Sequence, residues 1–276
     1  MRRLTRKAIV GLTLTAALAW MLLLAGQAQA ISRGVADGEG HPMVAALGGT
    51  TPEGVFRYCG AVLVSETVLL TAAHCLAPGA RPPGVELRVD FGNNATLNDP
   101  GWFAPVAEVA SPQFRTGPHG EIGFGRSSDV GVVLLAPGQS GGRPFAQLPT
   151  RNLLGVMDSH NGLAGTLFDL VGYGCHANGS SGGPHRAECG DTERQTASAP
   201  FQALRPNWLV LNINVNATGE GGGCVHDSGT PQFLHDTTRI VSVTISGDQV
   251  CRATQFNARL DTDTARAFLA QYVNLP

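Results

Sequence analysis

Basic residues are scarce in this 276-residue sequence, and almost all of them are arginines. Lys7 is the only lysine, against 18 arginines and 21 acidic residues. Four of the basic residues lie within residues 1–30, so the rest of the chain carries 15 basic and 21 acidic side chains, with no basic cluster. Nucleic acids and anionic membrane surfaces attract proteins with clustered positive charge. The sequence therefore argues against both kinds of partner.

The sequence also lacks the cysteine spacing of a metal site. No two of its six cysteines are spaced C-x-x-C, and its eight histidines are scattered, which argues against zinc. All six cysteines follow residue 30. An even number of cysteines in an exported chain predicts disulfides, although the sequence alone leaves many pairings open. We expect neither a metal ion nor an organic cofactor.

Residues 1–30 have the pattern of an export signal. Four basic residues precede an uncharged, mostly apolar run over residues 8–26, and Ala28 and Ala30 then supply the small-x-small pattern that signal peptidase accepts. A transmembrane anchor is the alternative, because the run is long enough to span a bilayer. The cleavage pattern favours secretion of a chain that begins at Ile31 and is long enough for one large domain or two small ones.

Long helical patterns are absent, and the secondary structure is predicted to be mostly β. Short apolar or alternating runs are separated by Gly, Pro, Asn and Asp, as in sandwiches and barrels. The runs cover residues 43–47, 61–64, 85–89, 130–135, 167–171, 209–215 and 240–245. One helix is expected near the C-terminus, where Asp261 or Thr262 can cap it and Phe268 and Leu269 lie on one face.

A glycine-rich segment over residues 221–231 (GGGCVHDSGTP) can hold one hydroxyl and several N–H groups in a fixed array. Its serine, Ser228, is a weak nucleophile alone. It needs a general base within hydrogen-bond reach and donors for the oxyanion that forms. An ordinary turn is the alternative for so short a motif.

A candidate base lies at the end of an apolar run over residues 68–75 (VLLTAAHC), where His74 precedes a cysteine. A lone histidine is more often structural than catalytic. This histidine has a second cysteine, Cys59, upstream of it, and a bridge between Cys59 and Cys75 would hold its strand against a neighbouring strand.

Three motifs together resemble the chymotrypsin/trypsin family of serine proteases. Residues 59–64 (CGAVLV) and 68–75 resemble the histidine region of that family, residues 128–135 (SDVGVVLL) resemble its aspartate-bearing strand, and residues 224–231 (CVHDSGTP) resemble its C-x-G-D-S-G-G-P. The order of the motifs differs from that in subtilisins and α/β-hydrolases. The resemblance spans nearly the whole chain after residue 30. Arginine in place of lysine is typical of GC-rich genomes and indicates a bacterial member, and the export signal indicates that this member is secreted.

The resemblance implies a catalytic triad. Ser228 would be the nucleophile, His74 its general base, and Asp129 the carboxylate that orients the imidazole. A strand-end carboxylate at the surface is the alternative for Asp129. In the family, the freed N-terminal amine pairs with the aspartate before the nucleophile, so Ile31 would pair with Asp227. A buried carboxylate needs such a partner, because leaving it unpaired is costly.

The resemblance also implies an all-β fold of two packed six-stranded antiparallel β-barrels with a C-terminal helix. Residues 31–145 would form the first barrel and residues 146–276 the second, with a Gly- and Pro-rich linker at residues 137–144 and the active site in between. A disulfide between Cys224 and Cys251 would resemble the family's link between the nucleophile loop and the far wall of the pocket. Cys175 and Cys189 are then expected to form the remaining pair.

Two residues depart from the family pattern beside the nucleophile. His226 stands where the family has the glycine whose N–H forms the oxyanion hole together with the N–H of Ser228. Thr230 replaces the second glycine of G-G-P. Histidine takes up unusual backbone angles less readily than glycine. These two departures predict an oxyanion hole that is distorted, or one that forms only when substrate binds.

A specificity pocket is also expected from the resemblance. Its floor would be Gly222, which offers no carboxylate to hold Arg or Lys, and its wall would include Ser242 and Thr244. Thr244 stands where the family has a glycine, and its side chain would narrow the entrance of the pocket. These residues predict cleavage after small or uncharged side chains, whereas Glu220 would restore a basic preference if its loop were shifted.

The sequence as a whole favours a secreted, monomeric serine endopeptidase that acts on protein or peptide substrates, with no nucleic-acid partner and no membrane partner once the signal is removed. A catalytically impaired homologue that binds a partner is one alternative. A non-proteolytic structural or adhesive protein is another, and it would make the ordered motifs a coincidence.

Overall fold

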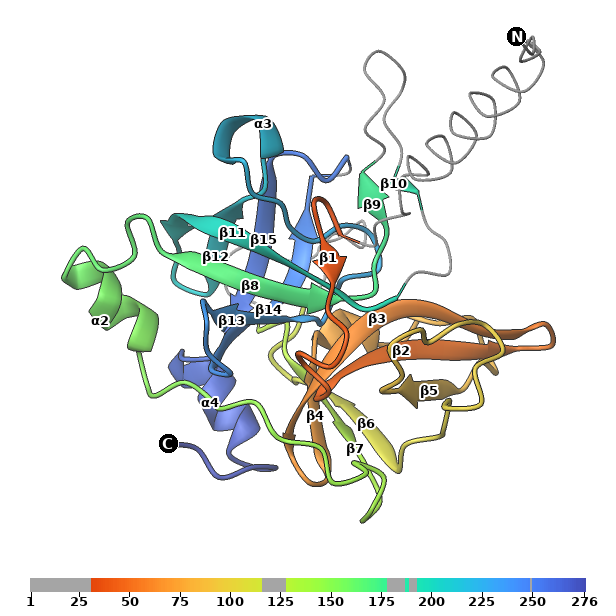
Figure 1. The fold of residues 1–276 in the computed structure, drawn as a ribbon. Helices are drawn as coiled ribbons and strands as arrows, with labels where there is room; N and C mark the ends of the chain where they lie inside the picture. Colours follow the sequence, from red (N-terminus) through yellow and green to blue (C-terminus); the bar gives the residue numbers. More distant parts are fainter. Residues whose placement is uncertain (1–30, 116–127, 178–186, 189–192, 249) are drawn as a thin grey trace, which may run out of the picture.

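The computed structural model describes residues 31–115, 128–177, 187–188, 193–248 and 250–276. Over these residues, two antiparallel sheets lie one beside the other, with short helices around them (Figure 1). The expected export signal, residues 1–30, lies outside the described residues. In the described part of the chain, no helix is long and apolar enough to span a bilayer.

The first sheet has six strands in the order β5-β2-β3-β4-β7-β6, all antiparallel. An isolated bridge between Val89 and Phe103 brings its two edges toward each other, so the sheet curls into a barrel-like shape. Its strands are β2 (Val44–Thr51), β3 (Gly54–Ser65), β4 (Val68–Thr71), β5 (Leu87–Asp90), β6 (Ala107–Ala110) and β7 (Gly131–Leu134).

The second sheet has seven strands in the order β1-β11-β12-β15-β14-β13-β8, and a further pairing of β8 with β11 closes six of them into a barrel. The short strand β1 is added at the edge of β11. The strands are β1 (Val35–Ala36), β8 (Leu167–Gly172), β11 (Gln195–Leu204), β12 (Trp208–Asn212), β13 (Pro231–Leu234), β14 (Ile240–Gly247) and β15 (Thr254–Arg259). A separate hairpin pairs β9 (His176–Ala177) with β10 (Ala187–Glu188).

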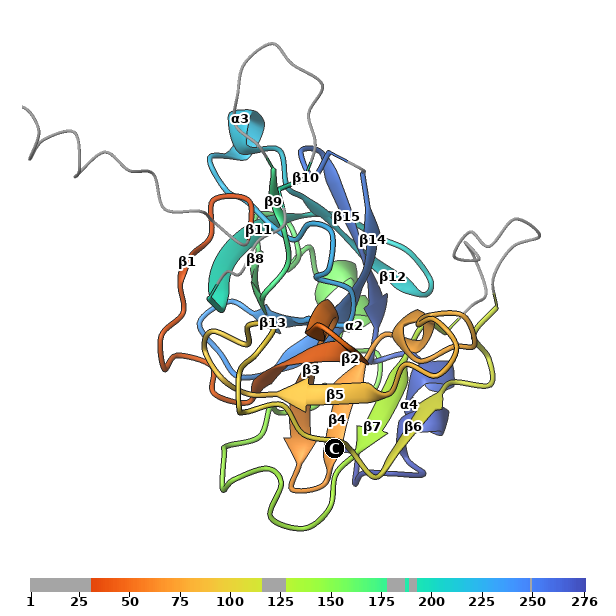
Figure 2. The ribbon, with the colours of Figure 1, turned by 90° about the vertical axis from the view of Figure 1, so that its right-hand side faces the viewer.

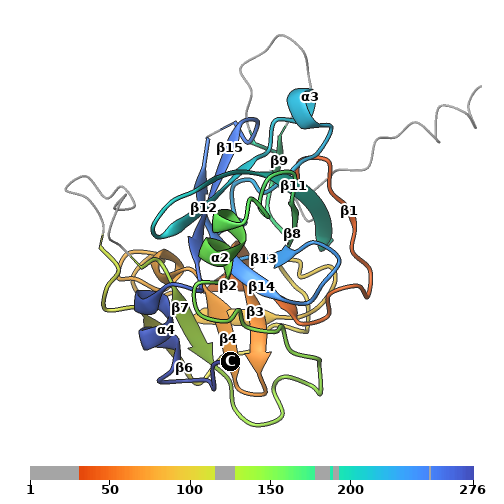
Figure 3. The same ribbon diagram turned by 90° about the vertical axis from the view of Figure 1, so that its left-hand side faces the viewer.

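The helices are short. They are the 3-10 turn η1 (Ala73–Cys75), α2 (Leu153–Ser159), α3 (Val215–Thr218) and α4 (Asp263–Leu269). Thr262 caps α4 by accepting a hydrogen bond from the N–H of Ala265 at 3.3 Å. Phe268 and Leu269 are buried in the core shared with the first barrel, so the C-terminal helix lies against the first barrel (Figure 3).

The two barrels are joined by apolar packing and by buried polar groups, among them Arg194. The main core cluster contains residues of both barrels, among them Leu47 and Phe233. Between the barrels, the guanidinium of Arg194, which is 1% exposed, donates to Asp37 Oδ2 at 2.7 Å and to the carbonyl of Val44 at 3.4 Å. Figure 2 shows the barrels stacked on each other along this boundary. A site shared between the barrels is therefore held in a fixed geometry.

The predicted fold class is confirmed: the chain is mostly β, with two six-stranded barrel-like sheets and a C-terminal helix. Two details differ from the simple division at residue 145. Residues 35–36 join the second sheet, and α4 packs against the first. The run predicted over residues 209–215 ends earlier, because β12 stops at Asn212 and α3 begins at Val215.

Candidate active site

His74 lies in the turn η1, immediately after β4, and is oriented by Asp129. The imidazole Nδ1 is 2.8 Å from Asp129 Oδ2, and the backbone N–H of His74 donates to Asp129 Oδ1 at 2.8 Å. β4 and β7 pair so that Thr71 lies opposite Gly131, which brings the residues just beyond these strand ends together. Asp129 is 1% exposed and is a hydrogen-bond acceptor, so Nδ1 carries the proton and Nε2 is left as the acceptor.

Ser228 comes from the second barrel and is docked onto the first. Its carbonyl accepts a hydrogen bond from the N–H of Gly60 in β3 at 2.8 Å. The next residue, Gly229, has a φ of +82°, and a side chain there would meet the hydroxyl of Thr71 at 2.1 Å. Only glycine fits at this position. The backbone of the serine loop (residues 221–231) is thus held against β3 and β4, the strands that precede His74.

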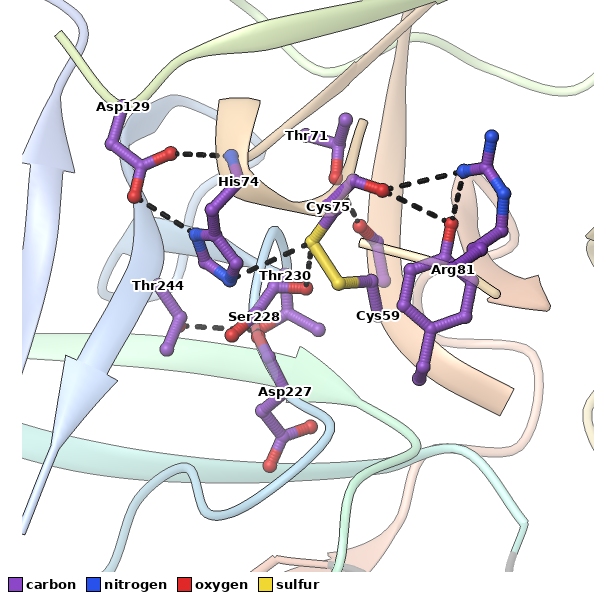
Figure 4. Close-up of a disulfide and its surroundings, with 12 residues drawn as sticks. Cys59, Thr71, His74, Cys75, Arg81, Asp129, Asp227, Ser228, Thr230 and Thr244 are labelled. Carbon is purple, nitrogen blue, oxygen red and sulfur yellow. Dashed lines mark hydrogen bonds and ion pairs between the residues drawn. A yellow bond between two sulfur atoms is a disulfide. The ribbon is translucent and has the colours of Figure 1, made fainter. Parts of the chain in front are cut away.

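The disulfide between Cys59 and Cys75 adjoins both residues (Figure 4). The sulfur of Cys75 is 3.8 Å from His74 Nε2 and 3.7 Å from the carbonyl oxygen of Ser228. In the figure, His74 lies between Asp129 and Ser228. The structure therefore brings together the three residues that the sequence proposes as a triad. Among the described residues, however, the Ser228 hydroxyl has no hydrogen-bond partner, so its bond to His74 is not formed. Such bonds often tighten only when substrate binds.

The expected oxyanion-hole residues have the required free donors. His226 adopts a left-handed φ of 73°, the region that favours glycine. Within the described part of the chain, the N–H groups of His226 and Ser228 donate to no other group. Partial burial of the imidazole, together with the nearby cation of Arg57, lowers the pKa of His226. The histidine is accommodated at the glycine position, at the cost of backbone strain.

Thr230 fits its position because glycines lie opposite it. Side chains added at Gly60 or Gly172 would come within 2.4 and 2.8 Å of the Thr230 methyl group. The hydroxyl of Thr230 donates to the carbonyl of Asp227 at 2.6 Å and is 3.1 Å from the hydroxyl of Thr244. The substitution of the second family glycine therefore adds a hydrogen bond that braces the serine loop.

Asp227 is completely buried, and backbone N–H groups hold its carboxylate. The N–H groups of Gly174 and Cys224 each donate to it at 2.9 Å. Burial raises its pKa from the ordinary 3.8 to about 7, against the opposing effect of these hydrogen bonds. Side chains at Gly172 or Gly174 would come within 2.3 to 2.4 Å of the carboxylate, so glycine is required at both positions.

Ile31 lies beside this region. Its side chain is fully buried against Leu170 and Ala197, and Ser32 pairs with the backbone of Gly222. The nitrogen of Ile31 is a peptide nitrogen in this chain, and it donates to Gln195 Oε1 at 3.2 Å. The expected pair between a freed Ile31 amine and Asp227 stays a prediction for the cleaved chain.

A cavity of about 260 Å³ adjoins the triad. His74 and Ser228 line it together with Gly223, Thr244 and Gln255. Larger hollows along the C-terminal segment contain none of the triad residues.

The cavity differs in part from the expected specificity pocket. Thr244 lines it, as expected, and the wall continues along β14 to Gly247. Ser242, expected in the wall, instead lies outside the cavity and is completely buried. The expected floor residue, Gly222, is likewise not among the residues that line the cavity, and Gln255 Oε1 lies 3.0 Å from where its Cβ would be. Glu220 is not among the lining residues either.

Gln255 could not be identified from the sequence, because β15 lacks the alternation of buried apolar residues by which a strand is normally recognised. Three of its residues that point into the barrel are polar: Gln255, Asn257 and Arg259, all buried. An apolar alternation is the usual sign of a buried strand face, and here the alternation is reversed.

Two disulfides join the described cysteines as expected, Cys59 to Cys75 and Cys224 to Cys251. Cys175 is also disulfide-bonded, and its expected partner Cys189 lies outside the described residues. In the described ranges, two groups of side chains have three potential metal-ligand atoms within 4.8 Å. One is the disulfide beside His74, whose bonded sulfurs are not thiolates. The other is the surface group of Asp169, His235 and Asp236.

Comparison with solved structures supports the same architecture. A structure of HL collagenase aligns with a TM-score of 0.60 at 16% sequence identity, covering 87% of this chain and 97% of that one. Human heparin binding protein aligns with a TM-score of 0.61 at 19% identity, covering 89% of this chain and 98% of the other. At such identities the likeness shows the fold alone. Among curated proteins, no sequence matches this chain significantly.

The family assignment comes from the sequence itself. The profile of the Trypsin family matches residues 32–262, which is most of the chain and includes all three triad candidates. Together with the two barrels and the site between them, this match shows that the chain belongs to the trypsin family.

Proposed function

We propose that this protein is a secreted serine endopeptidase that cleaves peptide bonds through an acyl-enzyme. One observation carries the proposal. His74 is bound through Nδ1 to Asp129, and His74 and Ser228 line one cavity. Among the described residues, the N–H groups of His226 and Ser228 donate to no other group. This arrangement supplies a nucleophile, a base with the correct tautomer and donors for the oxyanion in a single place.

In this mechanism, Ser228 Oγ attacks the carbonyl carbon of the scissile bond as His74 Nε2 takes its proton. The oxygen that becomes negative is stabilised by the N–H groups of His226 and Ser228. His74 then gives its proton to the leaving amine, and a water molecule attacks the acyl-enzyme by the reverse route. The carboxylate of Asp129 keeps the imidazole in this orientation and stabilises the imidazolium.

Processing is part of the proposal. Cleavage after Ala30 would expose the amine of Ile31, whose side chain already lies in a buried pocket next to the serine loop. That amine would neutralise Asp227, the residue that sets the backbone of the oxyanion hole. N-terminal sequencing of the secreted protein should therefore begin at Ile31, and a start far from this residue would contradict the processing step.

Labelling with a fluorophosphonate tests the catalytic proposal. We expect the wild-type protein to be modified at Ser228, and both Ser228→Ala and His74→Ala to stay unmodified while retaining the wild-type circular dichroism spectrum. Mass spectrometry of the labelled peptide gives the position. A folded wild-type protein that does not react would reject the proposal.

The second candidate is a homologue that binds a partner without cleaving it. It is favoured by the left-handed His226 in the oxyanion hole and by the absence of a formed bond between Ser228 and His74 among the described contacts. One of the structurally similar proteins is named for binding heparin, so the family fold alone does not decide the matter. An unreactive Ser228 would favour this second function.

A further inference from the structure

The side chain of Gln255 in β15 lines the cavity beside Ser228, although it is only 1% exposed. Its amide oxygen lies 3.0 and 3.1 Å from the positions that Cβ atoms of Gly222 and Gly223 would take. The amide therefore occupies the space next to Gly222, the residue that the sequence predicts as the pocket floor, and next to Gly223.

The amide of Gln255 is held on both sides. Its Oε1 accepts a hydrogen bond from the N–H of Gly223 at 2.7 Å. Its Nε2 donates to Asn257 Oδ1 at 2.7 Å and to Thr244 Oγ1 at 3.2 Å. Both amide hydrogens are thus used. A substrate side chain that displaced this group would leave buried polar atoms without partners, which is unfavourable. The side-chain amide of Gln255 is therefore held in a fixed position on the cavity wall.

We propose that Gln255 closes the inner end of the specificity pocket and restricts cleavage to bonds that follow small, uncharged side chains. This proposal rests on the proposed peptidase function. A neutral amide provides no counter-charge for Arg or Lys, and its position shortens the space for Phe or Leu. The carboxylate of Asp248 also lines the cavity, but both of its oxygens already accept hydrogen bonds from the backbone N–H groups of residues 252–254. Alanine and similar short side chains fit in front of it.

The chain contains a matched control for this residue. Gln232 in β13 is also completely buried, and its Nε2 donates to the same acceptor, Thr244 Oγ1, at 2.9 Å. Gln232 does not line the cavity. Replacing either glutamine by alanine removes a buried amide from Thr244, but only Gln255→Ala lengthens the pocket.

The test measures kcat/KM on peptide p-nitroanilides that carry Ala, Leu, Phe or Arg before the cleaved bond. The wild-type protein should be fastest on Ala. In Gln255→Ala the ratio of Leu or Phe to Ala should rise about tenfold or more, the scale at which added methylenes discriminate in apolar pockets. In Gln232→Ala the ratio should stay within about twofold of wild type. Gln255→Asn, which keeps an amide on a shorter side chain, should give a smaller rise and serves if the alanine variant does not fold.

The outcomes separate this inference from the proposed function. A wild-type protein that labels with fluorophosphonate but prefers Phe or Arg would overturn the inference alone, as would an equal change of the ratio in both alanine variants. A wild-type protein that neither labels nor cleaves any substrate would overturn both.

Discussion

The two barrels contribute to the site in different ways. The first barrel positions His74 and Asp129 at the ends of apolar strands that are buried except for Leu134, with a disulfide beside them. The second positions Ser228 and the cavity through buried polar side chains, among them Thr244 and Gln255. The half that orients the base thus depends on apolar packing and backbone pairing, whereas the half that shapes the oxyanion hole and the pocket depends on a hydrogen-bond network.

The network of the second barrel is centred on the hydroxyl of Thr244. It receives the amides of Gln232 and Gln255 and is hydrogen-bonded to Thr230, which in turn holds the carbonyl of Asp227. The end of the pocket and the loop of the nucleophile are therefore joined by one chain of hydrogen bonds. Thr230, which replaces a family glycine, is part of this chain, because its hydroxyl bonds to both Asp227 and Thr244.

The largest effect is expected from Asp129→Asn in the first barrel. The asparagine amide would donate to Nδ1 and force the proton onto Nε2, where it blocks removal of the Ser228 proton. We expect kcat to fall by roughly 10³- to 10⁴-fold, as this exchange does in triads of the family, with little change in the circular dichroism spectrum. Steady-state kinetics on an alanyl substrate would measure it.

A second histidine–aspartate pair provides the control. His235 Nδ1 lies 2.7 Å from Asp169 Oδ1 in the second barrel, but this pair is partly exposed and away from the cavity. Asp169 also raises the pKa of His235. Asp169→Asn should leave kcat within about twofold of wild type. Equal losses in both variants would mean that Asp129 acts through general stability and not through the tautomer of His74.

The next effect concerns the charge of Asp227. Its pKa is raised to about 7 in a chain whose Ile31 nitrogen is a peptide nitrogen. The folded state then favours the protonated acid, and this contribution to stability is lost as pH rises from about 4 through 7. A chain that begins at Ile31 has an amine to pair with the carboxylate. It should lose much less stability over the same range.

Thermal unfolding between pH 4 and 8 tests this difference on two chains, one beginning at Ile31 and one that retains Ala30. The two should unfold at similar temperatures at pH 4. At pH 8 the chain with Ala30 should be less stable by several kcal/mol, the scale of a buried charge without a partner. Parallel curves would show that the amine of Ile31 does not reach Asp227.

The difference between the barrels also explains why more of the site could be predicted from the sequence in the first barrel than in the second. In the first barrel, the motifs around His74 and Asp129 lie on apolar runs, so both the strands and the residues could be located. In the second, Ser228 was found by its motif, but Ser242 was placed in the pocket wall and Gln255 was missed. Polar residues on the inner face of β15 reverse the usual pattern, and only the paired strands show which of them meet.

The smallest predicted effect tests the contact between the barrels at Gly60 and Thr230. A methyl group at Gly60 would lie 2.4 Å from Thr230 Cγ2, whereas the next nearest atom, the Thr230 Cα, would be 3.5 Å away. Gly60→Ala should therefore destabilise the wild-type protein by about 1 to 3 kcal/mol, as overpacking does. Thr230→Gly removes the clashing group and also one hydrogen bond, at a cost of about 1 kcal/mol. The double variant should be close in stability to Thr230→Gly alone, giving a coupling energy of about 1 to 3 kcal/mol in urea unfolding. Simple additivity would mean that the serine loop moves freely against β3, and the fixed docking of Ser228 beside His74 would then need another explanation.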